Sequence, residues 1–149
     1  MYGFINKILG VVLCFAMMVI MICSVMLSDQ IQARRSIVAE VTNFLDEVTD
    51  SGNLTERQVA DLYLACSSYG PTTDVQLLRY VKVVNPDPKN PGSTYTTYVG
   101  SDDIYTWNQG DILKVKVTEI GYSGIASFVY NTLGILLAPV KFTLAGRVR

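Results

Sequence analysis

The hydrophobic pattern is uneven along the chain, and its first third predicts a long helix. Residues 8–27 form an uninterrupted apolar run with no charged residue and no proline. In helical form this run spans about 30 Å, the thickness of a bilayer's hydrocarbon core. A membrane or a bundle of identical helices would accept apolar side chains on every face. The run therefore predicts a helix that is buried in one of these two environments.

The apolar run continues into an amphipathic pattern without any signal for a helix break. Apolar residues recur at spacings of three and four, which is typical of a helix with one buried face. Gly52 is well placed to end the helix in a left-handed conformation. The sequence thus predicts one helix from Ile8 to Asp50, about 65 Å long. We expect its amphipathic half to pack against the rest of the chain through Ile31, Val38, Val41, Leu45 and Val48, with Ile37 and Phe44 widening the stripe.

A second, shorter helix is predicted directly after the first. Thr55 and Gln58 have the spacing of a capping box, and Gly70 with Pro71 ends the pattern. Its predicted buried face consists of Val59, Leu62, Tyr63, Cys66 and Tyr69.

The remainder of the chain predicts β-structure. Strand candidates are residues 75–84, 94–99 and 112–120, and a further alternation begins at Val140. Residues 125–138 are apolar and fit either a buried helix or a segment that lies against an assembly. The predicted fold class is therefore α+β: a long N-terminal helix, a short second helix and a small antiparallel sheet.

This pattern divides the chain into three parts. We expect residues 1–28 to be the hydrophobic helix, residues 29–52 its amphipathic continuation, and residues 53–149 a small extracellular α+β domain. A cleaved secretory signal has an apolar core of about 7–15 residues. The run here is longer and only Lys7 precedes it, so we expect the segment to be retained.

Composition narrows the range of functions. The chain has 12 basic and 13 acidic residues without a basic patch, which argues against nucleic-acid binding. It has no histidine, and so lacks the commonest general base and metal ligand. Cys14 and Cys23 fall on opposite sides of one helix and Cys66 is isolated, which excludes a disulfide framework. We expect no catalytic residues, no metal and no cofactor.

Acidic residues cluster in two places. Asp46, Glu47 and Asp50 form one group, and Asp102, Asp103 and Asp111 form another. Several carboxylates could hold calcium, but neither spacing fits a calcium-binding loop. We expect these side chains to be solvated.

Three stretches carry a resemblance to a known family. They are Phe44–Val48 with Gly52–Thr55, Gly110–Val117, and Phe142–Val148. In these stretches and in overall organisation the chain resembles type IV pilin-like subunits, and is most similar to the TadE-like minor pseudopilins of tight-adherence pili. It differs from major pilins in having Ile5 where they usually carry a glutamate. The resemblance implies a subunit that leaves the membrane and stacks with its N-terminal helices in the filament core.

The predicted function is therefore a structural subunit of an extracellular pilus-like filament at the cell surface. Its expected partners are the cytoplasmic membrane before assembly, the pilus assembly machinery, and copies of itself. The alternative is a single-pass membrane-anchored component of a secretion or conjugation machine that binds a partner outside the membrane. The predicted residues of the filament core are Ile8, Leu9, Val12, Leu13, Phe15, Ala16, Val19, Ile20, Ile22, Cys23, Met26 and Leu27.

Overall fold

The computed structural model describes residues 2–70, 72–121, 124, 127, 130, 131, 134 and 139–149. Its main feature is α1, a helix of 50 residues from Tyr2 to Ser51, about 75 Å long. The helix ends where the sequence predicts, because Gly52 adopts a positive φ of 63°. The Gly52 amide donates to the Val48 carbonyl at 2.9 Å, which closes the last turn. The predicted single long helix is confirmed, and it begins six residues before Ile8.

The second helix, α2 (Glu56–Ser68), has the predicted capping box. The Gln58 amide donates to the Thr55 hydroxyl, and the Thr55 amide donates to the Gln58 side chain. Leu62 and Cys66 are buried as predicted. Tyr63 differs from the prediction because its ring stays 44% exposed and only its hydroxyl reaches inward, donating to the Val75 carbonyl.

Four antiparallel strands form one sheet in the order β2-β1-β3-β4. The strands are β1 (Thr73–Pro86), β2 (Thr94–Ser101), β3 (Ile112–Glu119) and β4 (Lys141–Arg147).

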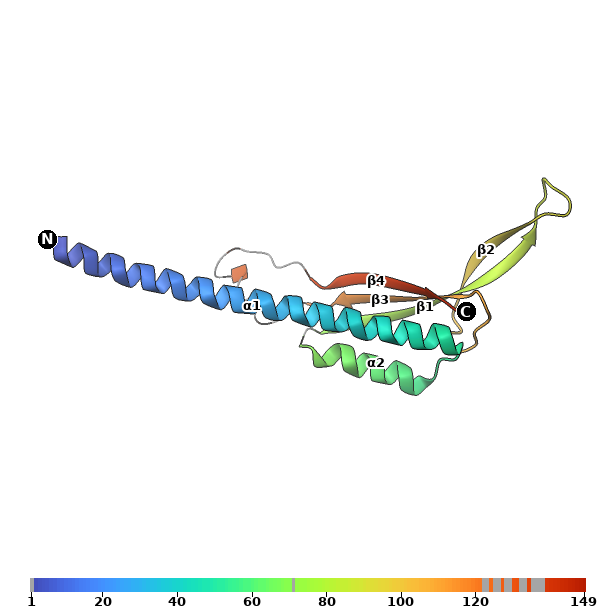
Figure 1. Cartoon of the computed structure of the whole chain (residues 1–149), viewed down its shortest axis with the longest axis horizontal. Helices are drawn as coiled ribbons and strands as arrows, with labels where there is room; N and C mark the ends of the chain where they lie inside the picture. The colour runs from blue at the N-terminus through green and yellow to red at the C-terminus, as the bar shows by residue number, and fades with distance from the viewer. Residues whose placement is uncertain are drawn as a thin grey trace.

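The long strand β1 is shared between two partners. Its first half, Thr73–Tyr80, pairs with β3, and its second half, Arg79–Pro86, pairs with β2. The β1–β2 hairpin consequently projects past the end of α1 (Figure 1).

The hydrophobic core lies between the helices and one face of the sheet. Alternation along β3, at the predicted strand 112–120, buries Leu113, Val115 and Val117 completely. They pack with the C-terminal half of α1 and with α2, which form the second layer (Figure 1). The chain is therefore an α+β fold with a two-layer head, from which the rest of α1 extends. The apolar stretch 125–138 lies largely outside the described residues.

Candidate functional site

The most unusual surface of the molecule is the N-terminal half of α1. We call residues 3–27 the apolar segment, and the part from Ile37 onward, with α2 and the sheet, the head. Large apolar side chains on the apolar segment are open to the surroundings, among them Phe4 at 71% and Val11 at 70% exposure. Figure 1 shows this segment extending away from the head. All twelve predicted filament-core residues, from Ile8 to Leu27, are exposed or half-buried in the single chain.

The apolar segment is long and hydrophobic enough to cross a membrane. The most hydrophobic part of the helix has a mean hydropathy of 2.9, and none of that part is buried within the molecule. Twenty-five helical residues span about 37 Å, slightly more than a bilayer core. The segment is therefore compatible with membrane insertion.

The C-terminal half of α1 has the opposite environment. Val41, Leu45 and Val48 are buried, as are Ile37 and Phe44. Of the other residues predicted to pack there, Val38 is half-buried and Ile31 is 44% exposed. The head thus holds α1 from residue 37 onward.

A close contact joins α1 to the edge strand β4. A Cβ atom added at Gly146 would lie 2.7 Å from Cγ2 of Thr49, so only glycine fits without a shift. The Arg149 amide donates to the Thr49 carbonyl at 3.1 Å. These contacts fix the last turns of α1 against the sheet.

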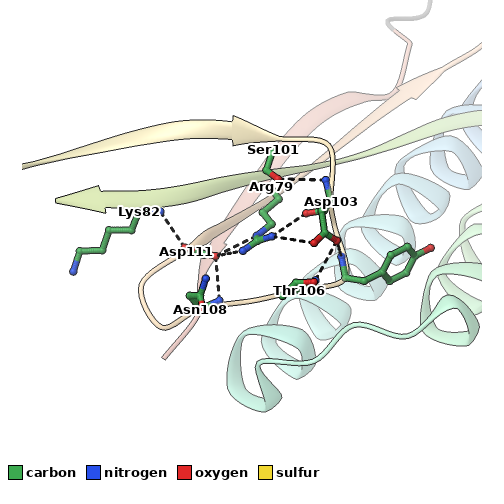
Figure 2. Close-up of polar contacts among 8 residues, drawn as sticks. Arg79, Lys82, Ser101, Asp103, Thr106, Asn108 and Asp111 are labelled. Carbon is green, nitrogen blue, oxygen red and sulfur yellow. Dashed lines mark hydrogen bonds and ion pairs between the residues drawn. The ribbon is translucent and has the colours of Figure 1, made fainter. Parts of the chain in front are cut away.

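A buried ion pair anchors the loop between β2 and β3. The Arg79 guanidinium lies 2.8 Å from an Asp111 carboxylate oxygen, and their side chains are only 5% and 1% exposed. Arg79 also donates to the Asp103 carbonyl at 3.1 Å, so it contacts both ends of the loop (Figure 2). The guanidinium carbon Cζ of Arg79 lies over the Trp107 ring, 5.3 Å from the centroid of the ring.

Asp111 accepts hydrogen bonds from three parts of the chain. The donors are the Arg79 guanidinium and the backbone amides of Lys82 and Asn108. Burial raises the pKa of the Asp111 carboxyl, but these donors and the positive charge of Arg79 outweigh it, and the pKa lies below its ordinary value. The carboxylate is thus ionised and fully engaged in holding β1, the loop and β3 together.

The predicted solvation of the acidic residues is wrong for Asp111, which is fully buried. The other five carboxylates, Asp46, Glu47, Asp50, Asp102 and Asp103, are exposed. Within the described residues no group of three potential ligands is arranged to hold a metal ion.

The cysteines provide no reactive site in the head. Cys66 is fully buried, and burial together with the nearby Glu40 carboxylate raises the pKa of its thiol. A raised pKa keeps the thiol protonated and weakly nucleophilic. Cys14 and Cys23 are free thiols in the apolar segment.

Sequence reasoning missed Arg79 as a structural centre. The available signal was an arginine directly between the apolar residue Leu78 and the aromatic Tyr80 in a predicted strand. Comparisons with family models, curated proteins and solved structures found no match to this chain.

Proposed function

We propose that this chain is a structural, pilin-like subunit that is inserted in the cytoplasmic membrane and then assembled into an extracellular filament. The observation that carries the proposal is the division of α1 into an exposed apolar segment and a half that is built into the head. A helix that is hydrophobic on all sides requires cover from lipid or from other helices. In a filament, the apolar segments of neighbouring copies provide that cover.

The continuity of α1 favours a filament over a simple tether. A membrane anchor can be joined to its domain by any flexible linker. Here the apolar segment and the head share one helix from Tyr2 to Ser51, fixed through Val41, Val48 and the Thr49–Gly146 contact. A rigid connection gives every head the same orientation relative to its helix, which a regular helical array needs.

The resemblance to TadE-like pseudopilins agrees with this architecture. It adds the expected partners, namely copies of the chain and a pilus assembly machinery. The buried polar centre at Arg79 and Asp111 also fits a structural protein, because its groups bond to one another and hold the loop.

A second candidate is a single-pass membrane protein whose head binds a component of a secretion or conjugation machine. The length of the apolar segment favours it, since about 37 Å of helix matches a bilayer. In this case lipid remains the permanent cover of the segment.

Fractionation of cells separates the two candidates. Surface appendages are sheared from cells that express the full chain, imaged by electron microscopy, and analysed by mass spectrometry next to the membrane fraction. The filament proposal predicts the chain as an abundant component of sheared fibres. Recovery only from membranes, without fibres, would contradict it and support the second candidate.

A further inference from the structure

A basic pocket lies at the end of the head where α1 stops. It has a volume of about 400 Å³ and is lined by Lys82, Gln109, Gly110 and residues 147–149. Gly110 forms its floor with a positive φ of 92°, and its amide donates to the Val148 carbonyl. The pocket therefore joins β1, the turn before β3 and the end of β4.

Two cationic groups converge in this pocket. Lys82 Nζ and Arg147 Nη2 lie 3.6 and 3.5 Å from the point where a Cβ of Gly110 would be, and so at most about 7 Å apart. Figure 2 shows the Lys82 side chain extending away from Asp111, which is already paired with Arg79. Among the described residues neither Lys82 nor Arg147 has a carboxylate partner, whereas Arg149 is paired with Asp50. Two like charges held this close without a counter-charge indicate a site for an anionic group.

The same chain carries a groove of opposite charge between α1 and α2. This groove has a volume of about 310 Å³, and Glu40, Glu47 and Asp61 line it around Phe44 and Leu62. Glu40 and Glu47 are seven residues apart on one face of α1, and each accepts a hydrogen bond only from a neutral side chain in the described structure. The donors are the Tyr69 hydroxyl, which donates to Glu40, and the side-chain amide of Gln58, which donates to Glu47. Neither Glu40 nor Glu47 forms an ion pair with a residue that the structure describes.

We propose that the basic pocket of one copy binds the Glu40–Glu47 carboxylates of a neighbouring copy. This inference rests on the proposed function and specifies how the heads meet in the filament. The pocket and the groove are different surfaces of the same chain, so the contact between two copies is head-to-tail. A row of such copies ends in a free pocket on one side and a free groove on the other. Such heterologous contacts repeat without limit unless the rotation closes a ring.

The positions of the two surfaces along α1 are compatible with parallel packing. The pocket lies at the level of Thr49 and Asp50, which contact Arg149. The groove is centred about six residues earlier, so an axial shift of about 9 Å between parallel copies brings the two surfaces to one level. Most of the apolar segment, about 37 Å long, still overlaps that of the neighbour after this shift.

Cross-linking between isotopically distinct copies tests the contact directly. The full chain is purified from membranes in detergent in ¹⁵N-labelled and unlabelled forms, mixed, and treated with a zero-length carbodiimide reagent. Mass spectrometry then identifies which carboxylate is joined to Lys82. We expect heavy–light peptides that link Lys82 to Glu40 or Glu47. Links from Lys82 only to other carboxylates, links only within one copy, or no link would overturn the proposal.

A charge exchange provides the second measurement and its control. Lys82→Glu and Glu47→Lys, each alone, are expected to weaken the self-association of the full chain in detergent about fivefold, measured by sedimentation, as for loss of an exposed ion pair. Combining the two substitutions restores association, because the glutamate at position 82 of one copy then pairs with the lysine at position 47 of its neighbour. Lys89→Glu makes the same charge change in the 87–93 loop and leaves this association unchanged. Failure of the double variant to recover would overturn the pairing.

The outcomes also separate this inference from the filament itself. Fibres that contain the chain but give no Lys82 link to Glu40 or Glu47 would remove the pocket contact and leave the proposed function intact. Links between copies in membranes, without any fibre on the cells, would support the contact and remove the filament.

Discussion

The two halves of α1 belong to one continuous helix, yet they meet opposite surroundings. In the C-terminal half, Ile37, Val41 and Val48 are completely buried against the sheet and α2. In the N-terminal half, Phe4, Val11 and Phe15 are each about two-thirds or more exposed. The C-terminal half completes the core of its own chain, and the N-terminal half has an equally apolar surface that the described part of the chain does not cover.

This difference shows that the two halves of α1 need different surroundings. The amphipathic half has exposed polar residues such as Arg35 and Asp46 away from its buried stripe, so only one face of it packs against the head. The apolar segment has no polar side between Ile8 and Val19 and must be surrounded. Folding of the head and burial of the apolar segment should therefore be separable by mutation.

The largest expected effect comes from placing a carboxylate in each half. Val41→Asp puts an unpaired charge in the core and should unfold the head, since such a charge costs several kcal/mol. Val19→Asp should leave the head folded and abolish membrane insertion or filaments, at a cost of about 2.5–3.5 kcal/mol. Circular dichroism of the full chain in detergent and counts of sheared fibres measure the two outcomes.

Val19→Leu is the matched control for the N-terminal half, because it keeps the apolar surface. Wild-type numbers of fibres from the Val19→Asp variant would contradict the need for an uninterrupted apolar surface in the N-terminal half. Loss of head folding in the same variant would show that the head does not fold independently of the apolar segment.

The next effect concerns the charged centre of the head. Asp111→Asn leaves the buried Arg79 guanidinium without its counter-charge, and we expect a loss of about 3–5 kcal/mol in the free energy of unfolding. Denaturant unfolding of the full chain in detergent measures this loss. The exposed Asp102→Asn is the control and should change stability by less than about 0.5 kcal/mol.

The same carboxylate predicts a pH dependence. Because the pKa of Asp111 is lower in the folded chain, its stabilising contribution is complete above the ordinary carboxyl pKa of about 3.9. The contribution is lost as the pH falls below that value and through the lower pKa of the folded state. Stability measured from pH 6 downward should therefore fall more steeply for wild type than for Asp111→Asn; parallel curves would contradict the assignment.

A smaller effect is expected where α1 meets β4. Gly146→Ala brings a methyl group to 2.7 Å from Thr49 Cγ2 and should cost about 1–3 kcal/mol through overpacking. Gly100→Ala is the matched control, since no heavy atom lies within 4 Å of its added Cβ. Equal thermal stability of the two variants would show that this contact does not fix α1 to the sheet.

The smallest effect tests the start of α2. Thr55→Ala removes the hydroxyl that accepts from the Gln58 amide and should lower stability by about 1 kcal/mol. Thr55→Ser retains the hydroxyl and should recover most of the loss in the same denaturant experiment. An alanine variant as stable as wild type would mean that packing alone holds α2.

Local patterns in the sequence predicted the elements of this fold. The continuity of α1, its end at Gly52, the capping box at Thr55 and the alternation of β3 all depend on residues a few positions apart. These features are visible in one sequence because helix and strand periodicity act over short distances.

Contacts between distant residues were not predictable in the same way. Arg79 and Asp111 are 32 positions apart, and their pairing depends on the division of β1 between β2 and β3. The pocket at Lys82 and Arg147 likewise exists only because β1 and the end of β4 meet at Gly110. Only the folded arrangement shows that these charges lie together.

In the proposed filament, apolar segments of different copies cover one another outside the membrane. Electron cryo-microscopy of sheared fibres shows whether they do. We expect fibres built from this chain, with residues 8–27 at the axis and neighbouring helices about 8–10 Å apart. Fibres without this chain, or fibres whose axis is formed by the heads while residues 8–27 lie outside, would contradict it.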